Sequence, residues 1–340
     1  MILAKPSTPL HGPHLAPRKN PSFPSSRSPQ KTATPPTRAF APTTDTNTTT
    51  TVLAPPDAPP FIILPGFGNA NRDYEAPFGN PDASLVTALQ RRGFSSFVVP
   101  CRRKDWFNVG KMIFTRGYWT GDCDTLPGYA WYLDRLRDTV AHARESTGSS
   151  KVILCGHSAG GWLARAFTGQ LNWKDEALSS SEDDPHDAVA GIVTLGTPHT
   201  APPPDSKQRD MTGGALRWVN ARWPGAYFTP AGVKYVAVGS RAVVGDRTAD
   251  RQSLQRYSYG AYRQVIGRGH GVEGDAVVPL EAALLEGSHH VVFENVLHSM
   301  SKVKTFDEPA GEGALWYGAD AVVDDWLRPL FGEVEGENVN

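Results

Sequence analysis

From residue 61 to about residue 330, short apolar runs alternate with amphipathic stretches, and this alternation limits the chain to very few folds. Consecutive apolar residues bounded by Gly or Pro are typical of buried strands, whereas apolar residues three or four positions apart are typical of helices. The predicted strands are Phe61–Leu64, Phe97–Pro100, Val152–Cys155, Val189–Leu195, Val233–Val238 and Val291–Val296. The predicted helices are Asp82–Arg92, Tyr132–Glu145, Ala159–Thr168, Leu280–Leu285 and a last one around Ala321–Trp326. The pattern predicts the α/β class, with a mostly parallel central sheet flanked by helices.

Two aromatic-rich segments interrupt this alternation, residues 102–128 after the second predicted strand and residues 199–230 after the fourth. Insertions that follow the carboxyl ends of parallel strands lie over the ligand crevice of an open α/β sheet. They are therefore candidate cap or pocket walls, although their aromatic side chains fit the cores of small subdomains equally well. The candidate pocket residues are Trp106, Trp218, Trp223 and His199.

The first 60 residues differ in composition from the rest of the chain. Residues 1–44 contain six basic residues and no acidic one, and 14 of the 29 prolines lie within residues 1–60. Because such a segment buries too little apolar surface to offset its chain entropy, we expect residues 1–60 to be disordered. A basic, hydroxyl-rich, acid-free start is typical of a transit peptide, and its proline density favours a chloroplast over a mitochondrion. The alternative is a disordered tail without a targeting role, on a protein of the cytoplasm.

Charge and cysteine content argue against several classes of function. The 340-residue chain has a formal net charge of −1, and without residues 1–44 it has 28 basic against 35 acidic residues, which gives no reason to expect nucleic acid as a partner. The three cysteines, Cys101, Cys123 and Cys155, do not fit a secreted disulfide framework. No apolar run reaches the length of about 18 residues that a membrane-spanning helix needs. We expect one domain over residues 61–330, followed by an acidic tail, residues 331–340.

The segment Gly156-His157-Ser158-Ala159-Gly160 lies directly between a predicted strand and a predicted helix. A G-x-S-x-G segment in that context is typical of a nucleophile elbow, a sharp turn that projects the serine oxygen above the sheet. Glycines are needed at its flanks because larger side chains would block the turn. We therefore predict that Ser158 is a catalytic nucleophile and that Gly156, His157 and Gly160 shape the turn.

A serine nucleophile needs a histidine base and a carboxylate that orients it, and with this type of turn they follow the serine in the order acid, then His. His298 directly follows the last predicted strand, and Asp275 lies upstream of that strand, with room for one helix between. We predict Asp275 and His298 as the other members of a triad. The competing residues are His157, His199, His289 and His290 for the base, and Asp246, Asp250 and Glu273 for the acid.

The loop after the first predicted strand, Pro65–Asn69, contains glycines that allow a backbone to approach a substrate closely. The amides of Phe67 in this loop and of Ala159 after the nucleophile are predicted to form an oxyanion hole. The loop lacks the third glycine and the Lys-Ser/Thr pair of nucleotide-binding loops. No group of His, Cys and Asp residues has metal-ligand spacing, and we expect neither a metal nor a cofactor.

Five segments together resemble the lipase and GPI inositol-deacylase-like branch of the α/β-hydrolases, and plastid-type members of photosynthetic organisms. These segments are Phe61–Phe67, Gly156–Gly161, Leu195–His199, Asp275–Pro279 and His298. The resemblance covers about residues 60–330 and implies the α/β-hydrolase fold, with an ester bond, commonly of a lipid, as the target. Lipases usually carry His-Gly where this chain has Pro65-Gly66, and GPI deacylases of the secretory pathway are embedded in a membrane, so only the general lipase-like chemistry is carried over.

The expected function is that of a cofactor-independent serine ester hydrolase that acts on an apolar acyl ester, with peripheral membrane contact as a further expectation from the resemblance. An acyltransferase or a thioesterase would use the same triad with another acceptor. The alternative outside the enzymes is a catalytically silent α/β-hydrolase that binds a small ligand or a partner.

Overall fold

The computed structural model describes residues 51–170, 185–203, 206–305 and 315–332. The predicted transit peptide and the acidic residues after Gly332 lie outside the described residues and stay predictions. Within the described part of the chain, no helix combines the length and the apolar character needed to cross a bilayer.

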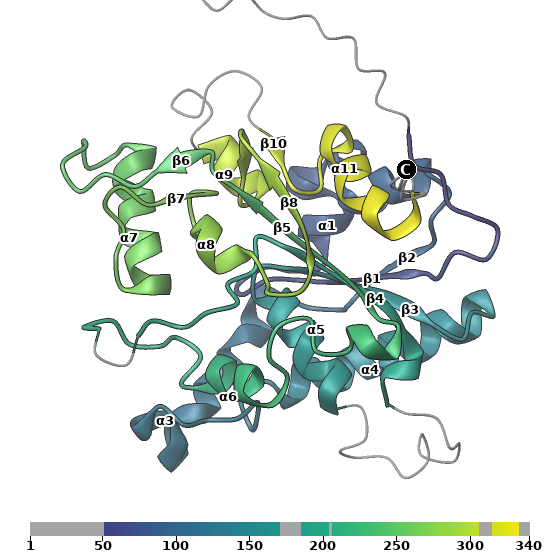
Figure 1. Cartoon of the computed structure of the whole chain (residues 1–340), viewed down its shortest axis with the longest axis horizontal. Helices are drawn as coiled ribbons and strands as arrows, with labels where there is room; N and C mark the ends of the chain where they lie inside the picture. The colour runs from purple at the N-terminus through teal and green to yellow at the C-terminus, as the bar shows by residue number, and fades with distance from the viewer. Residues whose placement is uncertain (1–50, 171–184, 204–205, 306–314, 333–340) are drawn as a thin grey trace, which may run out of the picture. The chain divides into compact units, whose positions relative to one another are not determined.

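A parallel sheet of six strands lies at the centre of the domain (Figure 1). Its strands follow the order β2-β1-β3-β4-β5-β8, and every neighbouring pair is parallel. Their bounds are β1 Phe61–Leu64, β2 Ser96–Val98, β3 Val152–His157, β4 Val189–Leu195, β5 Lys234–Ser240 and β8 His289–Phe293. The sheet confirms the predicted fold class. In this sheet β1 lies beside β3. The chain continues from β1 to β2 on one side and from β3 to β4 on the other, so the strand order reverses between β1 and β3. Open α/β sheets bind ligands at the carboxyl ends of the strands at such a switch point.

Helices cover both faces of this sheet, because successive residues of each strand point to opposite sides (Figure 1). Ile62 and Leu64 of β1 belong to the core shared with α4 and α5, whereas Phe61 and Ile63 belong to the core shared with α2 and α11. The described helices are α1 Arg72–Glu75, α2 Leu85–Arg91, α3 Arg116–Thr120, α4 Ala130–Thr147, α5 Ala159–Gln170, α6 Ala215–Arg222, α7 Leu254–Ile266, α8 Leu280–Ala283, α9 Met300–Thr305 and α11 Asp320–Phe331. Turns of 3-10 helix occur at Pro77–Gly79, Pro81–Ala83, Arg103–Phe114, Pro185–Ala188 and Thr229–Ala231.

Two small strand pairs lie outside the central sheet. They are the antiparallel pair β6 Val243–Val244 with β7 Glu273–Gly274, and the parallel pair β9 Val296–Leu297 with β10 Leu315–Trp316. The prediction of one strand over Val291–Val296 is therefore wrong in its extent. β8 already ends at Phe293, because the exposed polar residues Glu294 and Asn295 interrupt the apolar run before β9 leads to His298.

The two aromatic-rich insertions contact each other, since the Cys123 amide donates to the Gly213 carbonyl oxygen at 3.0 Å. The aromatic side chains of the first insertion differ in burial. Trp106 is buried, whereas Phe107, Phe114 and Trp119 expose 84%, 86% and 72% of their surface. The first insertion therefore contributes to the core and presents large apolar side chains to the solvent.

The domain begins about ten residues earlier than the sequence predicts. The Val52 amide donates to the Asp324 carboxylate at 2.8 Å, and the Ala54 amide donates to the Arg92 carbonyl oxygen at 2.8 Å. Residues 51–60 thus pack on α2 and α11, because the apolar side chains of this segment reach the core beside these helices. The boundary expected at residue 61 lies near residue 51.

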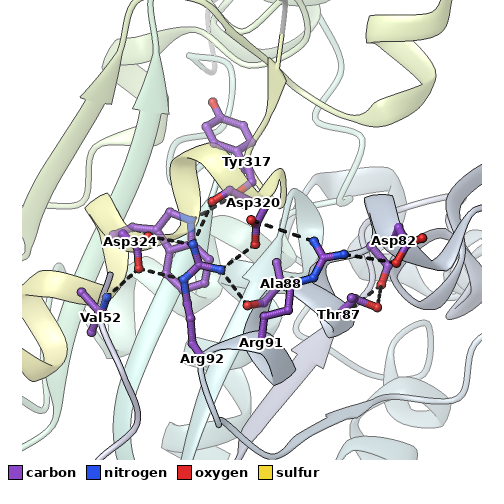
Figure 2. A network of polar contacts seen from close by, with 11 residues as sticks. Val52, Asp82, Thr87, Ala88, Arg91, Arg92, Tyr317, Asp320 and Asp324 are labelled. Carbon is purple, nitrogen blue, oxygen red and sulfur yellow. Dashed lines mark hydrogen bonds and ion pairs between the residues drawn. The ribbon is translucent and has the colours of Figure 1, made fainter. Parts of the chain in front are cut away.

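The buried Arg92 at the end of α2 connects α11 to the domain start (Figure 2). Its Nε and Nη2 each lie 2.7 Å from an oxygen of Asp324, and its Nη1 lies 2.7 Å from the Asp320 carboxylate. The carbonyl oxygens of Ala88 and Asp320 accept its remaining donors, so all five N–H groups are bonded. Burial raises the pKa of Asp324, but the guanidinium and the Val52 amide outweigh it and lower the pKa.

Replacement of this guanidinium is expected to destabilise the domain, because it leaves the Asp324 charge buried without a partner. Arg92→Met should lower the free energy of unfolding by about 3 kcal/mol at pH 7, measured by urea denaturation. Since the lowered pKa of Asp324 means that the pair stabilises above the unfolded pKa of about 3.9, the difference should shrink as the pH falls through the folded value.

The neighbouring Arg91 provides the matched control, because its ion pairs with Asp82 and Asp320 are largely exposed. Arg91→Met should cost about 0.5 kcal/mol or less. Equal losses for the two variants would contradict the role given to Arg92.

Candidate active site

Ser158 stands at the sharp turn between β3 and α5, at the switch point of the sheet. Its φ of +53° lies in the left-handed region, which costs a non-glycine residue about 1–3 kcal/mol. The flanking glycines make this turn possible. A Cβ on Gly156 would collide with the Gly161 backbone, and one on Gly160 would collide with the Leu64 carbonyl oxygen. The structure therefore has the nucleophile-elbow geometry that the spacing predicts.

His298 and Asp275 form a buried pair. His298 Nδ1 lies 2.8 Å from Asp275 Oδ2, and the His298 amide donates to the Asp275 carbonyl oxygen at 2.9 Å. The amides of Val277 and Val278 donate to Asp275 Oδ1 at 2.9 and 2.7 Å. Burial raises the pKa of Asp275, but His298 and these two amides outweigh it and lower the pKa. The carboxylate is thus ionised at neutral pH and accepts the Nδ1 proton, which leaves Nε2 of His298 as the acceptor that a base needs.

Tyr317, between β10 and α11, is a member of this site that the sequence analysis missed. Its buried hydroxyl donates to Asp275 Oδ2 at 2.9 Å. Burial raises the pKa of Tyr317 well above its ordinary value, so the hydroxyl stays protonated and remains a donor. The Asp275 carboxylate consequently accepts four hydrogen bonds, from one imidazole, one phenol and two amides.

The end of β4 joins the elbow to the His298–Asp275 pair. The Ser158 amide donates to the Leu195 carbonyl oxygen at 2.9 Å. A Cβ on the next residue, Gly196, would lie 2.5 Å from Asp275 Oδ2 and 3.1 Å from His298 Nδ1. The structure thus brings the three predicted triad residues to one site. The Ser158 hydroxyl itself forms no hydrogen bond with a described residue, and such contacts are often long before substrate binds.

The side chain of His157 connects the elbow to the loop of His298. It is buried, with Nε2 2.6 Å from the His298 carbonyl oxygen and Nδ1 2.7 Å from the Tyr74 hydroxyl. Because a carbonyl oxygen only accepts, Nε2 carries the proton and Nδ1 accepts from Tyr74. Burial and then the neighbouring His298 lower the pKa of His157 to about 3, so its imidazole is neutral. Both nitrogens are engaged, which argues against His157 as the base.

Tyr74 in α1 extends this connection to the predicted oxyanion loop. Its hydroxyl accepts from the Gly66 amide at 3.0 Å and from Asn69 Nδ2 at 2.9 Å. Gly66 touches the elbow directly, since a Cβ there would lie 2.7 Å from the Ser158 Cβ. The buried Tyr74 hydroxyl therefore holds the loop after β1 against Ser158. No local sequence pattern indicates this role of Tyr74.

Phe67 follows Gly66 in the chain, and Ala159 follows Ser158. Neither the amide of Phe67 nor that of Ala159 donates to a residue that the structure describes, and the oxyanion hole that they are expected to form stays a prediction. The Phe67 ring packs 5.2 Å from the ring of Trp106. Trp106 is buried, and its indole N–H donates to the Asn69 carbonyl oxygen at 2.9 Å. Trp106 thus contacts the loop after β1 at both Phe67 and Asn69.

The three other candidate pocket residues are placed as packing residues. His199 is buried, with its ring nitrogens 3.1 Å from Thr194 Oγ1 and 3.4 Å from an Arg165 nitrogen, and burial lowers its pKa well below the ordinary value. Trp218 and Trp223 form an edge-to-face pair, and Trp223 packs on the last turn of α5, more than two helical turns beyond Ser158. The pocket role expected for these three side chains finds no support in these contacts.

The remaining competing acids and bases lie outside the site. Asp246 and Asp250 accept local hydrogen bonds in the loop before α7, Glu273 is exposed in β7, and His289 and His290 begin β8. Strands of a parallel sheet start at the edge opposite to their carboxyl ends, so these two histidines are far from the elbow.

Residues 124–231 match a protein family described as the PGAP1-like alpha/beta domain. No curated protein matches the sequence. Among solved structures, the chain is similar to lipase BlEst2 of Bacillus licheniformis, with 14% identity, 76% of this chain and 94% of that chain covered, and a TM-score of 0.43. It is also similar to EstA of Clostridium botulinum, with 11% identity, 84% and 90% of the two chains covered, and a TM-score of 0.44.

Loss of the Tyr317 hydroxyl is expected to slow catalysis rather than weaken substrate binding. Tyr317→Phe removes one hydrogen bond to the ionised Asp275, a contact worth about 1.5–3 kcal/mol. We expect kcat for a short p-nitrophenyl ester to fall about tenfold with KM nearly unchanged.

Tyr235→Phe serves as the control, because Tyr235 is a buried tyrosine near the start of β5, at the opposite edge of the sheet. It should retain the kcat of the unaltered protein. A Tyr317→Phe variant with full kcat, or one in which only KM rises, would exclude the positioning role.

Proposed function

Because the chain has the α/β-hydrolase fold and carries a PGAP1-like alpha/beta domain, we propose that it is a lipase-like serine hydrolase that cleaves carboxylic esters. The observation that carries the proposal is the buried hydrogen bond between His298 and Asp275, which lies beside the left-handed elbow residue Ser158. A buried acid that orients an imidazole next to a strained serine is the arrangement that nucleophilic acyl transfer requires.

In the proposed mechanism, the Ser158 oxygen attacks the acyl carbonyl while His298 Nε2 accepts the hydroxyl proton. Asp275 stabilises the resulting imidazolium through the 2.8 Å bond to Nδ1. The amides of Phe67 and Ala159 bind the negatively charged oxygen of the tetrahedral intermediate. The imidazolium then protonates the leaving alcohol, which gives an acyl-enzyme and a free alcohol. Water attacks the acyl-enzyme with His298 again as the base, and the acid and Ser158 are released.

The surface of the first insertion supports an apolar acyl group as part of the substrate. Phe107, Phe114 and Trp119 are highly exposed, and Phe67 of the predicted oxyanion loop exposes 53% of its surface. Exposed apolar side chains grouped in one segment mark sites of contact with ligands, partners or lipids. We include a lipid ester, presented by peripheral contact with a membrane, in the proposed substrate class.

Replacement of the nucleophile tests the proposal directly. Ser158→Ala should lower the hydrolysis of p-nitrophenyl butyrate and octanoate by at least about 10⁴-fold, because the variant lacks the oxygen that forms the acyl-enzyme in the proposed mechanism. A fluorophosphonate probe should label the unaltered protein and not the variant.

Ser146→Ala, in an exposed part of α4, is the control and should keep both activity and labelling. Thermal unfolding of all three proteins shows whether the fold is intact. Undiminished hydrolysis by Ser158→Ala would remove Ser158 from the mechanism.

We further propose that the basic, acid-free segment of residues 1–44 directs the protein to a chloroplast. Residues 1–50 fused to a fluorescent protein should carry it into the chloroplasts of a leaf cell, whereas the chain without residues 1–44 should stay in the cytoplasm. Fluorescence in mitochondria or throughout the cytoplasm would contradict the assignment.

A further inference from the structure

The buried Arg165 in α5 carries a charge without a counter-charge. It is 2% exposed, forms no ion pair with a residue that the structure describes, and leaves its Nε without a partner among these residues. Burial lowers the pKa of Arg165 to about 10, so the guanidinium stays charged at neutral pH. A buried charge that no opposite charge neutralises is costly, and groups whose pKa is shifted by burial are concentrated at functional sites. Arg165 is therefore a candidate for a role beyond packing.

The guanidinium of Arg165 bonds to neutral groups of α6 and of the residues that follow it. Its Nη2 donates to the Trp223 carbonyl oxygen at 2.7 Å, and its Nη1 donates to Asn220 Oδ1 at 3.0 Å. Because the amide oxygen of Asn220 is thereby fixed on Arg165, the amide nitrogen faces the other way. This nitrogen, Nδ2, donates to the His199 carbonyl oxygen at 2.7 Å. Arg165 thus sets the orientation of an amide that bonds to the backbone of His199.

His199 ends the loop after β4, residues 196–199, and it is held through its backbone and its ring. The His199 amide donates to the Ala282 carbonyl oxygen at 2.7 Å, and the ring nitrogens lie 3.1 Å from Thr194 Oγ1 and 3.4 Å from Arg165 Nη1. Burial, and then the neighbouring guanidinium, lower the pKa of His199 well below its ordinary value, so its ring is neutral. The end of this loop is therefore fixed in place.

The other end of the same loop lies between the elbow and the acid–base pair. A Cβ on Gly196 would lie 3.1 Å from His298 Nδ1. Thr197 Oγ1 donates to the Gly156 carbonyl oxygen of the elbow at 3.4 Å, and a Cβ on Gly161 would collide with the Thr197 side chain. Because the loop packs this closely on both sides, its displacement would change the position of the imidazole relative to the elbow hydroxyl.

We propose that Arg165 is a positioning residue for catalysis, which acts through the Asn220 amide on the loop after β4. The inference rests on the proposed function, because the groups that this loop holds apart are those of the serine hydrolase. The fork of Arg165 orients Asn220, Asn220 fixes the His199 carbonyl oxygen, and the loop keeps His298 within reach of Ser158. Such precision affects rate, since a displacement of about 1 Å at a catalytic group slows a reaction by up to about 100-fold.

The variant Asn220→Asp separates positioning from a purely structural role. Its carboxylate keeps an acceptor for Arg165 and supplies the missing counter-charge, so the midpoint of thermal unfolding should not fall. It loses the donor to the His199 carbonyl oxygen and places a negative oxygen beside it. We therefore expect kcat for p-nitrophenyl butyrate to fall about tenfold with KM nearly unchanged. Titration with a fluorophosphonate counts the active sites to which kcat is referred.

Gln264→Glu is the matched control. It also turns an amide into a carboxylate and removes a donor to a carbonyl oxygen of the second insertion, that of Arg209 at 2.9 Å, but it does not touch the loop after β4. It should keep the kcat of the unaltered protein. Arg165→Lys adds a second test, because it keeps the charge but replaces the planar fork by a single nitrogen. It should lower kcat as Asn220→Asp does.

Full kcat in Asn220→Asp or in Arg165→Lys would overturn the inference, and so would a rise in KM alone. An equal loss of kcat in Gln264→Glu would also overturn it, because any loosening of the second insertion would then have the same effect. An unaltered protein that hydrolyses no ester and whose Ser158 is not labelled by a fluorophosphonate overturns the proposed function instead.

Discussion

The hydrogen bonds of the buried His157 imidazole connect the loops that carry the proposed catalytic groups. Those groups lie on four loops, after β1, β3, β7 and β9. His157 donates to the His298 carbonyl oxygen and accepts from the Tyr74 hydroxyl. That hydroxyl in turn accepts a hydrogen bond from the Gly66 amide. Charging this imidazole would turn an acceptor into a donor opposite the phenol, and burial makes that charge costly. The neutral state is therefore a structural requirement.

The ionised Asp275 imposes a second requirement that extends far beyond the site. A buried carboxylate is stable only when its oxygens are fully hydrogen-bonded, and one of its four donors is Tyr317. The backbone of Tyr317 is fixed by the indole N–H of Trp326 in α11, which donates to its carbonyl oxygen at 3.1 Å. α11 is itself held by the ion pairs of Arg92 with Asp320 and Asp324 (Figure 2). Asp275, at the carboxyl ends of the strands, is thus connected through Tyr317, α11 and Arg92 to residues 51–60, which pack on α2 and α11.

The sequence predicts those features whose physical cause is local or depends on chain order. The elbow is recognisable because its glycines, strand and helix are contiguous, and Asp275 and His298 follow from their order after it. Tyr317 and Tyr74 are not recognisable, since they contact residues 42 and 83 positions away and a single tyrosine in a short segment forms no pattern. Helix α7 is not recognisable because few of its residues are buried, and the expected strand Val291–Val296 spans the polar residues Glu294 and Asn295, where the chain passes from β8 to β9.

The side chains around the elbow residue Ser158 differ in chemistry from one direction to another. Towards the first insertion several side chains are aromatic and exposed, and the ring of Phe67 packs at a tilt against the buried ring of Trp106. Towards α1 and α9 the wall of a cavity carries Arg72 and Arg103. Under the proposed function, the exposed aromatic side chains are the part of this surface suited to contact the acyl group of the ester.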